Sequence, residues 1–416
     1  MRILEIITSL DPSGGGPIEG VKQLAAVNTA NGHQIEIASL DPADAPFIKS
    51  FPLPVHALGP RYFRYAYSSR YVSWLRQNAP RFDAVVINGV WQYTSLGAWR
   101  ALRNSSVPYV IFTHGQLDPW FNRQYPLKHL KKRLYWPAEY RVLRDAGAVL
   151  FTCIEEMELV RQSFSPFPDN GVVVGYGTAS PNGDPIAERE AFFAKFPEMR
   201  GKRIAVFLGR LHPKKGCDLL IQAFASVLAK DPAWRLLMAG PDSEGWQRQV
   251  SVMAQQLGIA DRITWSGMIG GDIKMGSLRA AEIFVLPSHQ ENFGVAVAEA
   301  LACGVPVLIT NKVNIWREIE SDGAGLVCED DLEGVSGIFA KWVALDDIER
   351  AAMRQRAQPC FLNRFDSRRA ARNLIDVLTR VTVKNATNDS RSTRQNDGQA
   401  HAVTGDSNDH SESGVA

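Results

Sequence analysis

Short apolar runs alternate along the chain with longer segments whose apolar residues recur at helical spacing. Each run is rich in Val, Ile, Leu and Ala and is followed by a loop of Gly, Pro or polar residues, as expected for buried strands. The strands predicted in this way are residues 2–10, 34–40, 84–88, 109–113, 149–153, 172–174, 203–208, 235–239, 262–265, 281–286 and 305–310. Strands that alternate with helices predict an α/β fold with parallel sheets.

A loop rich in Gly, Ser, Asn and Pro, Tyr176–Pro185, separates two halves that each contain several strand–helix pairs. A chain of 416 residues also suits two domains of this class better than one. We therefore expect two similar α/β halves that face each other across a linker, followed by one further helix. The expected boundaries are 1–176 for the first domain, 177–200 for the linker, 201–363 for the second domain and 364–384 for the helix.

The composition is that of an ordinary globular protein, with 45% hydrophobic and 22% charged residues and a net charge of +2. Basic residues dominate nucleic-acid binders, so we expect no nucleic-acid partner. The five cysteines lack metal-type spacing and suit the reduced thiols of a cytoplasmic protein. Glu5 interrupts the apolar start of the chain, which favours a strand over a signal peptide. The polar residues 385–416 contain almost no large apolar side chain and are predicted to be disordered.

Candidate binding residues in the first half follow predicted strands, where open α/β sheets bind ligands. Gly14, Gly15 and Gly16 lie between the first strand and a helix, so their backbone can approach an anion closely, although a flexible surface turn is the alternative. His114 follows the fourth strand and can hydrogen-bond a sugar hydroxyl or a reacting group, although a lone His is more often structural. Trp91 follows the third strand and can stack on a sugar ring, although packing is the commoner role of Trp.

The segment Lys128–Trp136 contains four permanent cations beside two leucines and two aromatic side chains. A basic amphipathic segment of this kind can lie on an anionic membrane surface. The alternative is an ordinary helix whose cationic face is solvated and whose Leu and Trp side chains face the core. The sequence leaves both interpretations open. No run in the chain approaches the ~20 continuous apolar residues of a membrane span.

The second half opens with an apolar strand that leads into Gly209-Arg-Leu-His-Pro-Lys-Lys-Gly216 and then into an amphipathic helix. Arg210 and Lys215 therefore flank a tight turn between strand and helix. Arg offers a planar fork of donors and Lys a point charge, a combination that suits a diphosphate. The alternative is that both are ordinary surface cations.

Two carboxylates lie in Pro287–Thr310, which we interpret as a loop, a helix ended by Gly304 and a further strand. Glu291 lies in the loop and Glu299 in the helix, eight positions apart (299 − 291). At the rise of a helix this spacing covers on the order of 10 Å, about the distance from the sugar to the ribose of a nucleotide diphosphate sugar. One such ligand could bridge the two glutamates.

These motifs together closely resemble the retaining glycosyltransferases of the large family four, which have the GT-B architecture of two facing Rossmann-like domains. The resemblance is carried by Phe207-Leu-Gly-Arg-Leu-His-Pro-Lys-Lys-Gly216, and by Glu291-Asn-Phe-Gly with Glu299-Ala-Leu-Ala-Cys-Gly-Val-Pro. It covers about residues 1–380 in layout, and it implies that the helix expected at 364–384 returns to the first domain. The match is sharp in the second half and looser in the first, where the Gly-rich loop and Thr-His-Gly are similar to the family pattern.

The resemblance implies a role for each matching residue. Arg210 and Lys215 would hold the leaving diphosphate, Glu299 the ribose hydroxyls and Glu291 the donor sugar. The remaining donor-site positions would be Asn292, Phe293 and Gly294 through their backbone N–H groups, Gly14–Gly16 from across the cleft, and Gly267, Met268 and Ile269 beside the base. His114 would lie near the sugar or the acceptor, and Trp91 is the candidate for acceptor binding.

The chemistry of the family follows from these roles. A pre-placed Arg and Lys stabilise the negative charge of the departing diphosphate more in the transition state than in the ground state. The resemblance implies retention by front-face attack, in which a departing phosphate oxygen accepts the proton of the acceptor. Glu291 and Glu299 would not act as the paired carboxylates of a glycoside hydrolase, which flank one bond. No Asp-x-Asp follows an apolar strand, so we expect no essential metal and no cofactor.

The resulting hypothesis is a cytoplasmic transferase that moves a hexose from a nucleotide diphosphate sugar to a lipid-linked or saccharide acceptor. Exopolysaccharide or lipopolysaccharide synthesis in bacteria, at the inner face of the membrane, would be its setting. Two alternatives remain open at this point: a nucleotide-sugar epimerase of the same architecture, and a catalytically silent protein that binds nucleotide sugars. The donor base, the donor sugar and the acceptor are not specified by these motifs.

Overall fold

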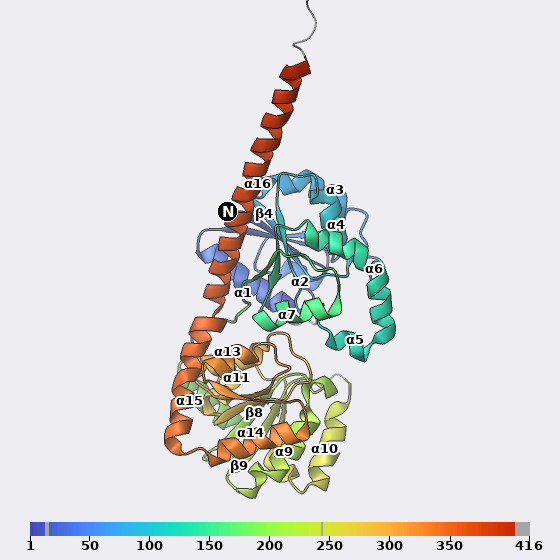
Figure 1. Ribbon diagram of the computed structural model, residues 1–416. Helices are drawn as coiled ribbons and strands as arrows, with labels where there is room; N and C mark the ends of the chain where they lie inside the picture. The colour runs from blue at the N-terminus through green and yellow to red at the C-terminus, as the bar shows by residue number, and fades with distance from the viewer. Residues whose placement is uncertain (13–15, 243, 404–416) are drawn as a thin grey trace, which may run out of the picture.

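Two parallel β-sheets, each covered by helices on both faces, make up the two halves of the molecule (Figure 1). The structure, a computed structural model, describes residues 1–12, 16–242 and 244–403, with side chains up to residue 387. The predicted α/β class with two Rossmann-like halves is confirmed. In the described part of the chain no helix is long and apolar enough to cross a membrane.

The first sheet has seven strands in the order β3-β2-β1-β4-β5-β6-β7, all parallel. Its elements are β1 (Arg2–Ile7), α1 (Gly16–Ala30), β2 (Gln34–Ser39), α2 (Pro46–Lys49), β3 (Val55–Ala57), α3 (Tyr71–Asn78), β4 (Ala84–Asn88), α4 (Tyr93–Leu102), β5 (Tyr109–Phe112), α5 (Trp120–Gln124), α6 (Pro126–Arg144), β6 (Ala148–Phe151), α7 (Ile154–Ser163) and β7 (Gly171–Val173).

The second sheet has six parallel strands in the corresponding order β10-β9-β8-β11-β12-β13. Its elements are α8 (Pro185–Lys195), β8 (Arg203–Leu208), the 3₁₀ turn η4 (Pro213–Lys215), α9 (Cys217–Ser226), β9 (Trp234–Ala239), α10 (Trp246–Gln256), β10 (Ile263–Gly267), α11 (Gly271–Ala280), β11 (Ile283–Leu286), α12 (Val295–Ala302), β12 (Val307–Thr310), α13 (Trp316–Ser321), β13 (Gly325–Cys328), α14 (Leu332–Ala344), α15 (Asp347–Cys360) and α16 (Ser367–Val403).

The strands are apolar at almost every position because both faces of each sheet are buried. In β1, Leu4 and Ile6 belong to the core on one face, and Ile3 and Ile7 belong to the core on the other. Successive side chains of a strand point to opposite faces, so two covered faces require a continuous apolar run. In both sheets the first strand of the half, β1 or β8, lies at the centre, where the strand order reverses. Ligands of open α/β sheets bind at the carboxyl ends of strands near that point.

The C-terminal helix α16 returns to the first half, where Leu374 and Leu378 pack into the core beside β1 and α1. Figure 1 shows α16 rising from beside α15 along the side of the first half. Residues 385–416 were predicted to be disordered, whereas the backbone remains helical to Val403. A polar segment can continue an existing helix without a core, because elongation is far easier than nucleation and helical hydrogen bonds are local. Residues 404–416 lie outside the described part.

The segment 177–200, expected to be a linker, contains helix α8. α8 packs against α11 of the second half at very close range, since a Cβ at Gly276 would lie 1.9 Å from the carbonyl oxygen of Glu188. Arg279 of α11 also forms an ion pair with Glu188 at 2.7 Å, and Glu188 is buried. Much of the segment is therefore part of the second half rather than a free connection.

Candidate active site

The loop from β8 to α9 carries Arg210 and Lys215 to the carboxyl end of the second sheet. Gly216 ends this loop with a φ of +65°, and a Cβ at this position would lie 2.0 Å from the carbonyl oxygen of Pro287. Only glycine therefore allows the β8–α9 loop to lie against the loop that follows β11. Two hydrogen bonds hold the loops together, from His289 N (2.8 Å) and Ser288 Oγ (3.1 Å) to the carbonyl oxygen of Lys214.

This loop contact brings Lys215 and Glu291 together: Lys215 Nζ donates to Glu291 Oε2. Burial, with smaller contributions from the cations of Lys214 and Arg210, lowers the pKa of Lys215 to about 7. Burial likewise lowers the pKa of Lys214 to about 8. Arg210 is exposed and forms no ion pair within the described residues. The loop therefore presents one free guanidinium and two desolvated lysines, a suitable site for a multiply charged anion.

Glu299 lies on the second turn of α12 and pairs with Lys274 of α11, whose Nζ is 2.6 Å from Glu299 Oε1. Each of the two predicted glutamates thus has a lysine partner. No sequence motif marked Lys274 as a site residue. The sequence places it in the first turn of the helix that follows the β10 loop, but does not indicate its contact with Glu299.

The backbone between the two glutamates offers unused donors. Gly294, with a φ of +74°, is the N-cap residue of α12. Within the described residues, no hydrogen bond takes up the backbone N–H groups of Asn292, Phe293 or Gly294. They precede a helix N-terminus, where free N–H groups and the helix dipole favour an anionic or hydroxyl-bearing ligand. Asn292 and Phe293 point their side chains away, toward the first half.

Gly267, Met268 and Ile269 form the turn between β10 and α11. Gly267 has a φ of +64° and its carbonyl oxygen accepts from Gly240 N at 2.9 Å. The Met268 side chain is largely exposed. That this turn contacts the base of the donor through its main chain stays a prediction from the resemblance. α11 begins directly after it and carries Lys274, so the turn and the Glu299 pair belong to one end of the second sheet.

Gly16 is the first residue of α1, whereas Gly14 and Gly15 lie outside the described residues. Tyr176 OH donates to the Gly16 carbonyl oxygen at 2.5 Å. The Tyr176 ring also makes edge contacts with His114 and with Phe293, at centroid distances of 5.7 and 5.6 Å. Tyr176 thus joins the start of α1, the His114 loop and the loop after Glu291.

His114 lies at the end of β5 with a φ of +47°, and its Nε2 is 2.9 Å from Asn88 Oδ1. The Asn88 amide donates to Glu5 at 2.7 Å, so Asn88 Oδ1 must accept the His114 Nε2 proton. Burial lowers the pKa of His114 to about 4 and raises that of Glu5 to about 7. His114 is therefore neutral near pH 7, and its Nδ1 is left as an acceptor for a ligand hydroxyl.

A hollow of about 520 Å³ lies beside His114 at the carboxyl ends of β1, β4 and β5. Polar and charged side chains dominate it, including Arg61, Arg64 and Gln92, which the sequence motifs did not indicate. Trp91 does not line this hollow. Its Nε1 donates to Gln116 O at 3.1 Å and its ring packs on Phe164 at 5.0 Å, so Trp91 is partly buried against the core of the first half.

The two halves touch through their ligand-facing loops. Asn292 Nδ2 donates to Thr152 Oγ1 at 3.1 Å, and Gln290 Nε2 donates to Asp118 Oδ2 at 3.1 Å. A Cβ at Gly115 would lie 2.6 Å from the Asn292 side chain, so a glycine is required for this approach. The Glu291 loop and the His114 loop are thus held against one another.

Buried Glu156 on α7 connects these loops and was not anticipated from the sequence. Its Oε1 accepts from Thr113 Oγ1 and Gly115 N, both at 2.6 Å, on either side of His114. Its Oε2 accepts from Thr152 N at 2.8 Å and Thr152 Oγ1 at 2.7 Å, with Asn292 Nδ2 at 3.4 Å. One carboxylate therefore fixes the His114 turn and reaches the donor-side loop. Within the described residues, no group of His, Cys, Asp and Glu could hold a metal ion.

Family models match both halves of the chain. The model described as Glycosyl transferases group 1 matches residues 188–358, and the model described as Glycosyl transferase 4-like domain matches residues 15–177. The chain belongs to the group 1 glycosyltransferases. The group 1 match covers Glu291, Glu299 and both of their lysine partners, and the 4-like match covers His114.

A D-inositol 3-phosphate glycosyltransferase of Rhodococcus opacus (strain B4) is 29% identical over 196 residues, which cover 46% of this chain. The match spans only 44% of that relative's own length. Sucrose-phosphate synthase from Thermosynechococcus elongatus has a TM-score of 0.74 and 19% identity, covering 92% of this chain and 100% of that one. Anabaena Alr3699/HepE in complex with UDP has a TM-score of 0.72 and 19% identity, covering 91% and 100%. At these identities the two structures establish the shared fold.

Glu156→Gln is expected to lower kcat/KM for glycosyl transfer by ~10- to 100-fold, because the amide supplies one acceptor where the carboxylate supplies two, and the His114 turn would shift. Transfer rate and melting temperature should be measured together. Glu158→Gln, an exposed position on the same helix, is the matched control and should leave both unchanged. Equal activity in the two variants would show that Glu156 has no role in positioning the loop.

Proposed function

We propose that this glycosyltransferase uses a nucleotide diphosphate sugar and transfers its hexose, with retention, to a lipid-linked or saccharide acceptor. The observation that carries the proposal is the pairing of Lys215 with Glu291 and of Lys274 with Glu299 at one end of the second sheet. The solved relative HepE is described in complex with UDP, which makes UDP-hexoses the first donors to test.

The donor would lie between the two lysine–glutamate pairs. Arg210 and Lys215 would contact the diphosphate and stabilise the charge that builds on it as the glycosidic bond breaks. Glu299 would accept from the ribose hydroxyls and Glu291 from the hydroxyls of the sugar. The free N–H groups of residues 292–294 would donate to the sugar and the phosphate.

The acceptor would enter the hollow beside His114, opposite the donor loop. The neutral His114 would accept a hydrogen bond from a sugar hydroxyl at Nδ1. Arg64 would attract an acceptor that carries phosphate or carboxylate groups, whereas Arg61 is already paired with buried Asp41 at 3.0 Å. A cytoplasmic role in polysaccharide or lipopolysaccharide assembly is the setting we propose, because those pathways supply lipid-linked acceptors of this kind.

A thermal-shift screen against nucleotide sugars tests the proposal. A ligand that binds only the folded protein raises the melting temperature, by an amount that grows with its concentration. We expect at least one nucleotide sugar to stabilise the wild type, and Lys215→Ala to reduce the shift only in part. A chain that no nucleotide sugar stabilises would contradict the proposal.

The donor found in this way should then be incubated with and without candidate acceptors. Consumption that depends on the acceptor, with the anomeric configuration preserved in the product, supports retaining transfer. Conversion of the nucleotide sugar into an epimer without any acceptor would instead identify an epimerase.

A further inference from the structure

The outer face of α6 carries an apolar stripe that the fold leaves uncovered. Leu127, Leu130 and Leu134 recur at helical spacing along one side of the helix and are 78%, 57% and 78% exposed. The opposite side of α6 anchors it, because Trp136 and Leu143 are buried against the first half. The leucines therefore do not face the core, which was the alternative that the sequence left open for this segment.

Cations surround this stripe without acidic partners. Lys128, Lys131, Arg133 and Arg141 are exposed on α6, and none of them forms an ion pair within the described residues. Lys132, the remaining cation of the segment, points inward, with its Nζ 4.8 Å from the Trp91 ring centroid. The cationic surface of α6 thus consists of Lys128, Lys131 and Arg133, and it continues to Arg141 near the end of the helix.

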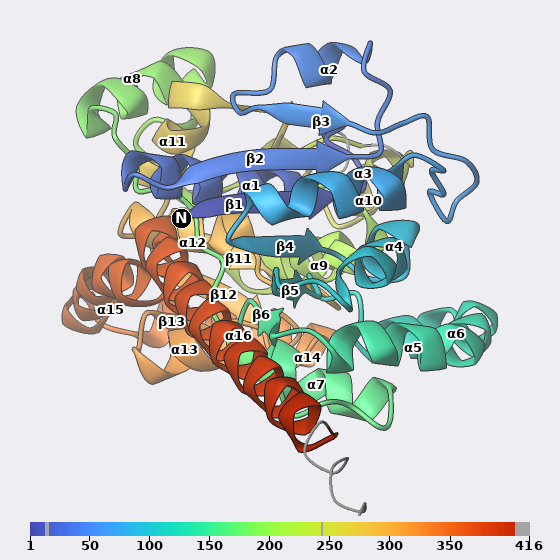
Figure 2. The ribbon, with the colours of Figure 1, turned by 90° about the horizontal axis from the view of Figure 1, so that it is seen from above.

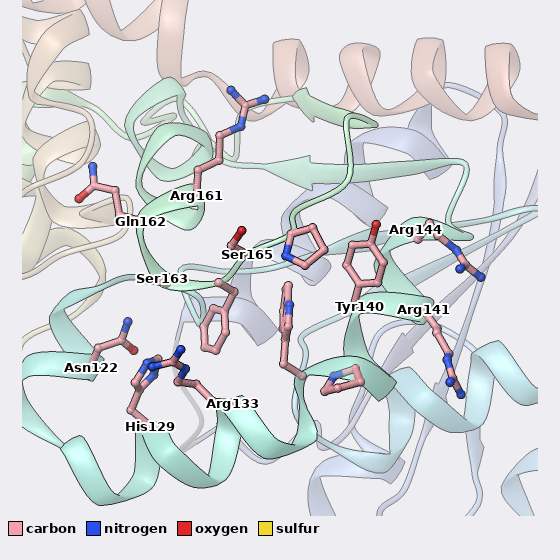
Figure 3. A pocket seen from close by; sticks show the side chains of 14 residues that line it. Asn122, His129, Arg133, Tyr140, Arg141, Arg144, Arg161, Gln162, Ser163 and Ser165 are labelled. Atoms are coloured by element: carbon pink, nitrogen blue, oxygen red, sulfur yellow. The ribbon is translucent and has the colours of Figure 1, made fainter.

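A cavity of about 740 Å³ between α6 and the end of α7 extends the cationic surface. Arg133, Arg141 and Arg144 of α6 and Arg161 of α7 line it, and Figure 3 shows their side chains around the hollow. The nearest acidic partners are exposed: Asp145 contacts Arg144 at 2.7 Å, and Asp169 lies 4.0 Å from Arg161. Four guanidinium groups therefore line this cavity, and Arg133 and Arg141 among them have no acidic partner within the described residues.

We propose that α6 docks the protein on the surface of an anionic lipid bilayer. The three leucines enter the interface between headgroups and acyl chains, while the flanking lysines and arginines contact headgroup phosphates. Both views place α6 at the outer edge of the first half, where a flat surface can reach it (Figures 1 and 2). A narrow leucine row with cations on its sides complements a lipid surface better than an apolar protein groove, which would leave the cations unpaired.

Docking through α6 also fixes the acceptor side of the enzyme relative to the lipid. Lys132 Nζ lies 3.4 Å from Gln116 O, and Gln116 lines the hollow beside His114. The membrane-facing helix and the proposed acceptor site are therefore in direct contact. A lipid-linked acceptor would reach the hollow without leaving the bilayer surface.

The test is co-sedimentation of the full chain with vesicles of phosphatidylglycerol and phosphatidylcholine, compared with phosphatidylcholine alone. The wild type should bind the anionic vesicles, and less so at high salt. The triple variant Lys128→Gln, Lys131→Gln, Arg133→Gln should bind about a hundredfold more weakly, at about 1 kcal/mol per cation. The triple variant Leu127→Ser, Leu130→Ser, Leu134→Ser should lose at least about tenfold.

Two matched controls make the same changes elsewhere on the surface. Lys195→Gln, Lys202→Gln, Lys341→Gln removes the same charge, and Ile186→Ser, Ile348→Ser, Leu362→Ser removes three other exposed apolar side chains. Both controls should sediment like the wild type, with unchanged melting temperatures in all variants.

Equal sedimentation of the α6 variants and the wild type would overturn the proposal, as would a wild type that ignores anionic vesicles. If the wild type instead forms dimers that the leucine variant abolishes, a second copy covers this face and the proposal is wrong. No donor or acceptor is needed for these measurements. Their outcome is therefore independent of whether the proposed transfer reaction is correct.

Discussion

Lys215→Ala is expected to lower kcat for glycosyl transfer by ~100- to 1,000-fold, the loss seen when one preorganised group that stabilises transition-state charge is removed. Lys215 is largely buried at the β8–α9 turn, and its ammonium group contacts Glu291. A buried cation aimed at a departing diphosphate acts where no water competes with it. Its removal should reduce kcat more than it raises the KM for the donor, because the charge develops mainly in the transition state.

The comparison that decides this prediction uses three variants that must remain folded by circular dichroism and melting temperature. Glu291→Ala should also lose transfer, because the donor sugar would lose its main acceptor and Lys215 would lose its partner. Lys202→Ala, an exposed lysine just before β8, is the control and should be fully active. Undiminished transfer in both Lys215→Ala and Glu291→Ala would show that this site does not take part in the reaction.

The same lysine predicts a pH dependence. Its pKa is lowered to about 7 by burial, so the free enzyme loses this positive charge as the pH rises through neutrality. Since kcat/KM follows the ionisation of the free enzyme, it should fall above about pH 7 in the wild type and remain level in Lys215→Arg, which keeps its charge. The Glu291 carboxylate favours the charged form of Lys215. If kcat/KM of the wild type instead stays level up to pH 9, the ion pair with Glu291, and not burial, determines the charge of Lys215.

The parts of the fold that the sequence predicted are those with strong local patterns. β4 and β8 occupy the predicted residues, and Gly304 ends α12 with a φ of +73°. The two strands that the apolar pattern missed, β3 and β13, lie at sheet edges and have three and four residues. Short edge strands need few apolar side chains, because an edge strand has a neighbouring strand on only one side.

The residues of the candidate site likewise divide into those in strong local patterns, which the sequence predicted, and those that it missed. Glu291, Glu299 and Lys215 were predicted because they lie in motifs of fixed spacing after apolar strands. Lys274 and Glu156 are equally close to the proposed ligands, but each acts on a residue that is distant in sequence, 25 positions away for Glu299 and 41 for Gly115. Such pairs follow from the packing of helices on the sheet, which a single sequence does not encode in any local pattern.

Arg279→Ala is expected to destabilise the second half by ~3–5 kcal/mol, the usual effect of removing one partner from a buried ion pair. Its guanidinium group lies 2.7 Å from Glu188, whose side chain is almost fully buried between α8 and α11. The variant leaves that carboxylate without its counter-ion. Urea unfolding, followed by tryptophan fluorescence, should show an earlier midpoint for the transition of this half.

The functional consequence follows from the position of α11. This helix carries Lys274 one turn before Arg279, and its close contact with α8 at Gly276 fixes its distance from the sheet. If α8 loosens, Lys274 no longer has a fixed position beside Glu299, so Arg279→Ala should also weaken donor binding. The double variant Glu188→Leu, Arg279→Met removes both charges and should recover most of the stability. An Arg279→Ala protein as stable as the wild type would show that the ion pair is not needed and that apolar contacts alone hold α8 against α11.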